Sequence, residues 1–220
     1  MKRQNILKHL EKEKFNTYYQ YLIEENKKLN LTAITKKEDV YSKHFYDSMV
    51  ISDFLSFEDK KVLDIGAGAG FPSIPLMLVC DSMQLTIIDG LNKRIKFLER
   101  LRDKLDISVE LIHGRAEEIK LFNHFDVILA RAVAKLNILV EMALPLLKIN
   151  GYFVAFKSIH FQDELDASLK AIQLMGGKVE NIITYPIDES ITHVYIVIKK
   201  LKKSPKGYPR SFAKIKKSPL

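Results

Sequence analysis

From residue 60 onward, short apolar runs alternate with amphipathic stretches along the chain. Such runs, four to eight residues long and rich in Val, Ile, Leu and Phe, are typical of buried β-strands. Seven of them lie at 61–66, 84–89, 107–112, 125–130, 151–156, 179–184 and 192–199. The segment after the second run predicts an amphipathic helix, because apolar side chains recur there every three or four residues. They are Leu91, Ile95, Leu98, Leu101 and Leu105.

Strands that alternate with helices at this spacing form right-handed βαβ units, and hence a mainly parallel sheet with helices on both faces. The last two strands are separated only by the sequence PIDESI, residues 186–191. This connection is too short for a crossover, so the two strands are expected to pair as an antiparallel hairpin at one edge. The predicted fold is an α/β, doubly wound, Rossmann-like sheet.

Residues 1–59 have a different, helical pattern. A first periodic segment contains Ile6, Leu7, Leu10, Tyr18, Tyr21 and Leu22, and a second runs from about 39 to 55. Between them, NKKLNLTAIT (26–35) interrupts the periodicity and predicts a loop. The chain is therefore expected to divide into an N-terminal helical extension (1–59), a sheet domain (60–199) and a short C-terminal tail (200–220).

Composition favours a globular protein of the cytoplasm. The 220 residues are 47% apolar and 28% charged. The longest apolar stretch, 71–80, contains a serine and two prolines and is shorter than the roughly 20 residues that span a bilayer. The N-terminus has no apolar signal-peptide core, and a single cysteine, Cys80, cannot form an internal disulfide. We expect a monomer that does not associate with membranes.

Positive charge is concentrated at the C-terminal end. Residues 199–220 hold nine Lys or Arg and no acid, so the first 198 residues carry a formal charge of −1 within a total of +8. Tyr208 and Phe212 lie among these cations, and three prolines disfavour a continuous helix. Aromatic rings interleaved with Lys and Arg suit RNA, because rings stack on bases while cations hold the backbone. A solvated, solubilising terminus is the alternative interpretation.

The first predicted strand ends in the glycine-rich sequence DIGAGAGFP, residues 64–72. Gly66, Gly68 and Gly70 allow a tight turn and a close approach of a ligand to the backbone. Asp89 ends the second strand, where a carboxylate can bind both hydroxyls of a ribose. In sheets of this kind, ligands bind outside the carboxyl ends of the strands. The pattern therefore predicts a ribose-bearing cofactor in this place.

The spacing of the glycines distinguishes two cofactors. A dinucleotide site usually reads GxGxxG, whereas here an acid, Asp64, stands two residues before Gly66. This pattern resembles the DxGxGxG signature of class I S-adenosylmethionine-dependent methyltransferases, and the C-terminal hairpin is found in the same class. A nicotinamide-dependent dehydrogenase is the enzymatic alternative. S-adenosylmethionine is the expected cofactor.

The ends of the later strands carry further candidates. After the third strand, Ala116 and Glu117 are placed to frame an adenine with a backbone amide and an acid. Arg131 ends the fourth strand and Lys157 the fifth. A charged residue in such a position favours a role in catalysis, and an ion pair with a neighbouring acid is the structural alternative. The six histidines show no metal-ligand spacing, so no metal is expected.

Six motifs in order extend the resemblance to one family. They are NKKLNLTAIT (26–35), HFYDS (44–48), DIGAGAGFPSIPL (64–76), GRAEE (114–118), ARAVA (130–134) and YPRSFAKIKKSPL (208–220). Together they resemble the ribosomal RNA small-subunit methyltransferase G family, also called the glucose-inhibited division protein B family. Some positions depart from the family pattern: Ser73 stands where a glycine is common, and Ser158 follows Lys157 where a glycine is common.

The resemblance implies methylation of guanine N7 in 16S ribosomal RNA, with free RNA or the small ribosomal subunit as the partner. It implies cofactor contacts at Gly66, Phe71, Ala116, Glu117 and Arg131. It also implies an RNA-facing C-terminal motif with Arg210, Lys216 and Lys217. Guanine N7 has a free lone pair, so no general base is needed. A small-molecule methyltransferase of the same fold and a non-catalytic RNA-binding protein are the alternatives.

Overall fold

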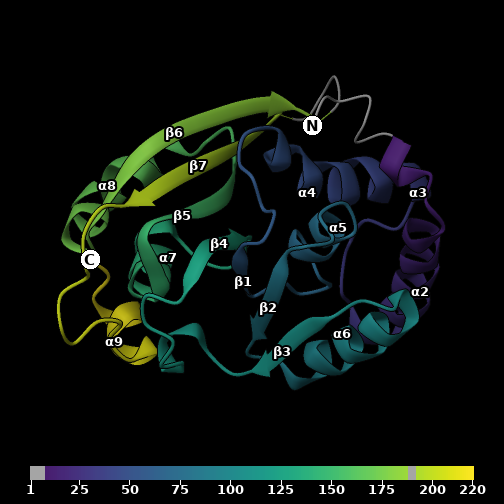
Figure 1. The fold of residues 1–220 in the computed structure, drawn as a ribbon, viewed down its shortest axis with the longest axis horizontal. Coiled ribbons are helices and arrows are strands. Elements are labelled where there is room, and N and C mark those ends of the chain that lie inside the picture. Colours follow the sequence, from purple (N-terminus) through teal and green to yellow (C-terminus); the bar gives the residue numbers. More distant parts are fainter. Residues whose placement is uncertain (1–7, 188–191) are drawn as a thin grey trace.

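The computed structural model describes residues 8–187 and 192–220, which form one sheet flanked by helices (Figure 1). The strands are β1 (Lys61–Ile65), β2 (Gln84–Asp89), β3 (Val109–His113), β4 (Phe125–Arg131), β5 (Leu147–Ser158), β6 (Gly177–Pro186) and β7 (Thr192–Lys200). Their order in the sheet is β3-β2-β1-β4-β5-β7-β6. The first five strands pair in parallel, and β7 pairs antiparallel with both β5 and β6. The predicted sheet and its C-terminal hairpin are confirmed.

Side-chain alternation along the strands creates two hydrophobic cores. In β1, for example, Val62 faces one core and Leu63 the other. The first core packs against α5 (Ser73–Met77), α6 (Asn92–Leu105) and the N-terminal helices. The second packs against η3 (Ala116–Glu118), α7 (Leu136–Ala143), η4 (Leu144–Leu146), α8 (Gln162–Leu174) and α9 (Phe212–Lys217). Figure 1 shows the first group on the right and the second on the left.

The N-terminal region is helical, as predicted, but its loop is shorter than predicted. Helix α2 runs over Glu13–Leu29, so the first four residues of the predicted loop are helical. The helix ends at Asn30, which adopts a left-handed conformation, and the Asn26 side chain binds the backbone of Leu31 and Thr32. The Asn26 side chain, which belongs to the last turn of the helix, therefore fixes the first residues of the loop by hydrogen bonds. Ile6 and Leu7 of the first periodic segment lie outside the described residues.

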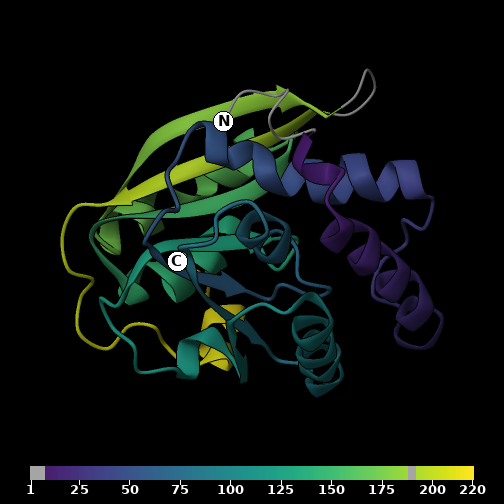
Figure 2. The ribbon, with the colours of Figure 1, turned by 45° about the vertical axis from the view of Figure 1, so that its right-hand side comes forward.

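The second N-terminal segment is a continuous helical run with an unusual middle (Figure 2). It comprises α3 (Lys37–Val40), the π-helix η1 (Tyr41–Tyr46), α4 (Asp47–Met49) and the 3-10 helix η2 (Val50–Asp53). Single π-helical turns are rare and occur frequently at functional sites. This turn carries Lys43 and His44. The backbone carbonyl oxygen of Lys43 and Nδ1 of His44 both contact the guanidinium of Arg131 at the end of β4.

The C-terminal tail is packed against the domain rather than free. Lys200 is fully buried, and its ammonium donates to the carbonyl oxygens of Leu144 and Leu147; burial lowers its pKa to about 8. Ile215 of α9 is also fully buried. The prediction that the prolines prevent a continuous helix agrees with a helix of six residues. Since both flanking segments share cores with the sheet, the proposed three-part division stays a prediction.

A buried ion pair joins the N-terminal region to the sheet. Asp47 has no solvent exposure, and one of its carboxylate oxygens lies 2.9 Å from Nη1 of Arg131. Its other oxygen accepts hydrogen bonds from Tyr185 and from Nδ1 of His193, at 2.8 Å for the histidine. The Tyr195 hydroxyl donates to the Asp47 carbonyl. One carboxylate thus connects the N-terminal helices, β4 and the β6–β7 hairpin.

This geometry predicts the cost of removing Arg131. Arg131→Ala should lower the free energy of unfolding by about 3–5 kcal/mol, because it leaves the Asp47 carboxylate buried without its cation. Adding Asp47→Asn should recover much of that loss, since an amide carries no charge but still accepts from His193. Urea denaturation measures both variants. Lys135→Ala, on an exposed side chain close by, is the control and should change stability by less than about 0.5 kcal/mol; an equal effect of the two alanine variants would contradict the prediction.

Candidate active site

The candidate site lies at the carboxyl ends of β1, β2, β3 and β4. Strand order reverses between β1 and β4, because β2 continues on one side of β1 and β5 on the other side of β4. Ligands bind at this reversal in open α/β sheets. The sequence candidates at Gly66, Asp89, Ala116 and Arg131 all follow or end these strands. The topology therefore brings them to one edge of the sheet, as predicted.

The glycine loop is shaped from both sides. Gly66 has a φ of +72°, and a Cβ there would meet the Val133 side chain at 2.8 Å. At Gly70, with a φ of +98°, a Cβ would lie 2.6 Å from the Tyr18 hydroxyl. Gly68 also has a positive φ, but nothing lies within 4 Å of its Cβ position. The loop thus packs tightly at its two ends and leaves open space at its middle glycine.

Asp89 is buried at the end of β2 and reaches back to this loop. Its Oδ2 accepts from the amide of Gly68 at 3.2 Å and from Arg94 at 3.3 Å, while Oδ1 accepts from the amide of Leu91. A carboxylate has about four lone-pair sites, two on each oxygen, so one acceptor site remains, on Oδ1. The side chain lies beside the glycine loop, and its predicted contact with a ribose stays a prediction.

Glu117 has the clearest unmet hydrogen-bonding capacity in the site. Both of its carboxylate oxygens are buried, and neither has a partner among the described residues. Burial raises the pKa of this carboxyl group above its ordinary value. Ala116 beside it is almost fully buried. Since buried polar groups are nearly always paired, this acid indicates a position for a ligand that donates hydrogen bonds.

Asp64, the acid of the glycine motif, lies beneath the loop. It is fully buried, and its Oδ2 accepts from the Ser73 amide at 3.3 Å. Burial raises the pKa of Asp64 to about 7. Its Oδ1 and the Ser73 hydroxyl have no hydrogen-bond partner among the described residues. Ser73, which departs from the family pattern, is itself fully buried beside Asp64.

Phe71 and Arg131 are held by N-terminal residues whose contacts sequence reasoning did not predict. The Phe71 ring is stacked between Tyr18 and His44, with centroid distances of 5.5 and 4.4 Å. Nη2 of Arg131 lies 3.0 Å from Nδ1 of His44 and 2.9 Å from the Lys43 carbonyl oxygen. Burial lowers the pKa of His44 to about 4, so the ring is neutral and its Nδ1 accepts from the arginine.

The HFYDS motif was the only sequence signal for these contacts. It contains both His44 and Asp47, but their partners lie far along the chain. His193, which binds Asp47, had no signal at all in the sequence. Arg131 is therefore in the ion pair that was the structural alternative for this residue, and its predicted contact with cofactor or substrate stays a prediction.

Lys157 is also in an ion pair. Its ammonium lies 2.7 Å from Oε1 of Glu164 and 3.2 Å from the Ala134 carbonyl oxygen. The side chain is 13% exposed and borders a cavity of about 650 Å³ between the ends of β4 and β5. The predicted catalytic role of Lys157 stays a prediction, and the structure adds the cavity beside it.

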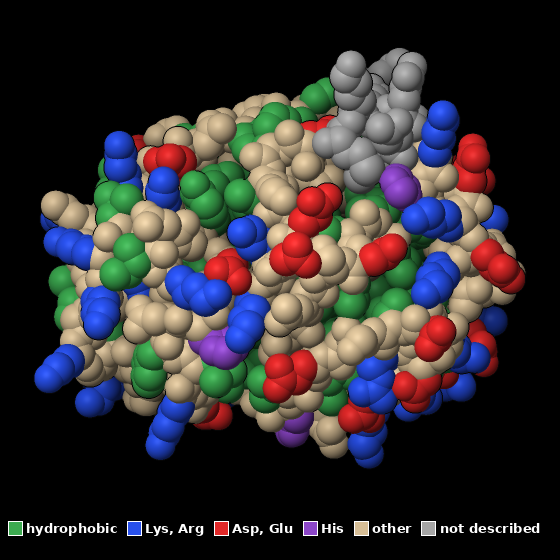
Figure 3. Space-filling view, viewed as in Figure 1, with side chains coloured by type: hydrophobic (Ala, Val, Ile, Leu, Met, Phe, Trp, Pro, Cys, Tyr) green, Lys and Arg blue, Asp and Glu red, His purple; other side chains and the backbone are tan. Residues whose placement is uncertain are grey.

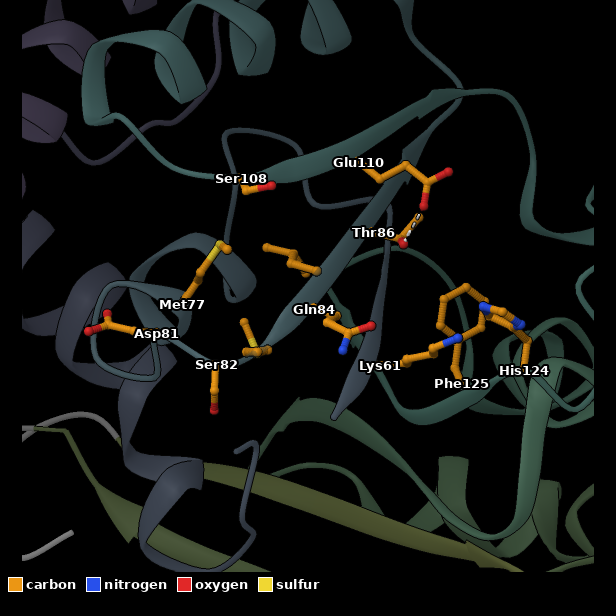
Figure 4. A pocket seen from close by; sticks show the side chains of 12 residues that line it. Lys61, Met77, Asp81, Ser82, Gln84, Thr86, Ser108, Glu110, His124 and Phe125 are labelled. Atoms are coloured by element: carbon orange, nitrogen blue, oxygen red, sulfur yellow. Dashed lines mark hydrogen bonds between the residues drawn. The ribbon is translucent and has the colours of Figure 1, made fainter. Parts of the chain in front are cut away.

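Another cavity, of about 440 Å³, lies towards the amino ends of β1, β2 and β3, away from these residues (Figure 4). Glu110 lines this cavity, and its carboxylate accepts from the Thr86 hydroxyl at 2.9 Å. Met77 and Asp81 lie on the opposite wall. Cofactors in this class of sheet bind at the carboxyl ends, so we assign the candidate site to the glycine loop.

Surface charge is unevenly distributed. Figure 3 shows Lys and Arg side chains along the left-hand margin, where Figure 1 places the C-terminal tail. Lys216 and Lys217 are exposed, but Arg210 forms a bidentate pair with the fully buried Glu141, at 2.7 and 2.6 Å. Within residues 8–187 and 192–220, no helix is long and apolar enough to cross a membrane, and no group of His, Cys, Asp and Glu suits a metal ion.

The chain is similar in sequence to known proteins. Residues 11–192 match the family model described as rRNA small subunit methyltransferase G. The chain is 44% identical to the ribosomal RNA small subunit methyltransferase G of Bacillus subtilis (strain 168) and 46% identical to that of Oceanobacillus iheyensis (strain DSM 14371 / CIP 107618 / JCM 11309 / KCTC 3954 / HTE831). Each alignment covers 94% of this chain and 90% of the relative.

The fold is also that of solved methyltransferases. The crystal structure of M. jannaschii TYW2 in complex with AdoMet superposes with a TM-score of 0.61 at 15% identity, covering 79% of this chain and 81% of that one. At this identity, the likeness shows the fold alone. The family model and the relatives, which span nearly the whole chain, show more: this chain belongs to the rRNA small subunit methyltransferase G family.

Proposed function

We propose that this chain transfers a methyl group from S-adenosylmethionine to N7 of a guanine in 16S ribosomal RNA. The observation that carries the proposal is the family match over residues 11–192, together with relatives whose names state methylation of small-subunit ribosomal RNA. The site geometry supports it, because the glycine loop, Asp89 and Glu117 meet at one edge of the sheet. The cytoplasm, where ribosomes are found, is the proposed location.

The residues present fit S-adenosylmethionine. The open space at Gly68 accepts a ligand against the backbone, and Asp89 lies beside it for the ribose hydroxyls. The unpartnered oxygens of Glu117 suit the amino group of adenine, which donates hydrogen bonds. When bound, this cofactor supplies a methyl group activated by a sulfonium. The buried Ala116 beside Glu117 suits an apolar contact with the adenine ring.

The protein's task in this reaction is positioning. Guanine N7 has an in-plane lone pair, so the residues need not remove a proton before attack. Holding two reactants in line can contribute roughly 7–11 kcal/mol to lowering the barrier. The ion pairs of Arg131 with Asp47 and of Lys157 with Glu164 support a positioning role for both cations at the ends of β4 and β5.

The exposed cations of the tail support RNA binding. Lys216 and Lys217 carry no ion pair among the described residues and lie on α9, which packs on α7. The carbonyl oxygen of Leu220 accepts from Asn137 at the start of α7, so the tail ends close to the carboxyl end of β4. Cations at this position can hold RNA phosphates beside the site.

One experiment tests the reaction directly. Purified protein is incubated with methyl-labelled S-adenosylmethionine and small ribosomal subunits from a strain that lacks this gene. We expect label in 16S RNA and strand scission specific to 7-methylguanine at one guanine. Label without scission would indicate that the methyl group is transferred to an atom other than guanine N7. Absence of label despite cofactor binding would favour a small-molecule acceptor or a non-catalytic RNA-binding protein.

Glu117→Gln tests the cofactor site. Hydrogen bonds to charged groups contribute about 1.5–3 kcal/mol, so the dissociation constant for S-adenosylmethionine should rise about tenfold or more in calorimetric titration. The melting temperature should stay constant or rise, because the variant removes a buried charge that has no partner. Glu118→Gln, at the exposed neighbouring acid, is the matched control. Equal affinities of the two variants would remove Glu117 from the site.

The tail requires variants that leave its packing intact. Lys216→Gln combined with Lys217→Gln should weaken binding of 16S RNA and reduce the salt dependence of its affinity. Fewer phosphates are then neutralised, so fewer counterions are released on binding. Affinity for S-adenosylmethionine should not change. Lys170→Gln with Lys178→Gln removes equal charge from exposed positions elsewhere and is the matched control.

Arg210→Ala should instead lower the free energy of unfolding, because it leaves the Glu141 carboxylate buried without its cation. A variant that loses affinity for RNA but keeps its stability would contradict this assignment.

A further inference from the structure

The cavity between the ends of β4 and β5 lies next to the proposed cofactor site. Its volume of about 650 Å³ is within the range of small-molecule sites, about 300–1,000 Å³. Val133 lines the cavity, and the same side chain contacts the position of Gly66 in the glycine loop. Val133 therefore lies between the cavity and the loop that we assign to the cofactor.

This cavity is lined by both acidic and basic side chains, and the acids lie together. Asp163 and Glu164, in the first turn of α8, form one wall, and Lys135 and Lys157 also line it. Glu164 uses Oε1 for the Lys157 ammonium and the Leu136 amide, and its Oε2 has no partner among the described residues. Asp163 is exposed and has no hydrogen bond or ion pair among them either. Oε2 of Glu164 and the carboxylate of Asp163 are therefore acceptors to which no group of the described residues donates.

These acceptors suit guanine among the four RNA bases. Guanine has two adjacent donors on its Watson–Crick edge, N1–H and the N2 amino group, and a carboxylate accepts from both. Adenine has an acceptor at N1, which a carboxylate repels. An ammonium such as that of Lys135 can donate to guanine O6. Since N7 is on the opposite side of the purine, a base held in this way keeps N7 free.

We propose that this cavity receives the target guanine and that Asp163 and Glu164 select it by accepting hydrogen bonds from N1–H and the N2 amino group. The inference rests on the proposed function and adds residues that determine its specificity. Glu164 has a further, structural part, because its Oε1 fixes Lys157 and the start of α7. Asp163 has no such part, so it is the better residue for a test.

The test compares guanine with adenine at the methylated position. Small subunits that carry either base at this position are incubated with S-adenosylmethionine and with wild type, Asp163→Asn or Glu164→Gln, and methylation is measured. We expect each variant to lower kcat/KM on the guanine substrate by about tenfold or more and to reduce the preference for guanine over adenine. An amide can pair with adenine, donating to N1 and accepting from the amino group. Asp166→Asn, on the exposed face of the same helix, should behave as wild type.

A binding measurement separates this inference from the proposed function. Guanosine and adenosine monophosphates are titrated into the protein in the presence of S-adenosylhomocysteine and followed by NMR. Wild type should bind the guanosine nucleotide more tightly, and Asp163→Asn should lose that preference. A preference that persists in both acid variants, in either experiment, would overturn the inference. Absence of methylation by wild type would overturn the proposed function alone, because the nucleotide titration still reports on the cavity.

Discussion

The Asp47 carboxylate has no contact with solvent, and the arrangement around it decides where the N-terminal region can lie. An ionised carboxylate in a protein interior must be paired, because its desolvation costs several kcal/mol. Its partners come from three distant segments: Arg131 from β4, and Tyr185 and His193 from the β6–β7 hairpin. Satisfying this one charge therefore fixes the N-terminal helices against the end of the sheet.

The consequences of that pairing reach the glycine loop. With Arg131 held in place, the π-helical turn brings His44 against Phe71, and α2 brings the Tyr18 hydroxyl to the Ala69 carbonyl oxygen at 2.6 Å. A loop with three glycines in left-handed conformations has much backbone entropy to lose. The contacts from the N-terminal helices oppose that freedom. The extension thus acts as a support for the cofactor loop.

Sequence reasoning predicted the sheet well and its polar contacts poorly, for a physical reason. Strands and the α6 helix follow from local periodicity, and the positions of Gly68, Asp89 and Glu117 follow from strand ends, which parallel pairing brings together. The partner of Arg131 is 84 residues away in the chain, at Asp47. No local pattern encodes such a pairing. The tail is a related case: composition shows its charge, but only packing reveals that Lys200 and Ile215 are buried.

The neutralisation of both strand-end cations is consistent with the chemistry proposed for the site. When bound, S-adenosylmethionine would supply its methyl group from a positively charged sulfonium, so positive charge would lie close to these residues. Two unit charges 4 Å apart interact by about 4 kcal/mol at an effective dielectric of 20, so Arg131 or Lys157 without its acidic partner would oppose binding of the sulfonium. Asp47 offsets Arg131 and Glu164 offsets Lys157. The two ion pairs therefore supply rigid, oriented side chains at the mouth of the site without adding net positive charge.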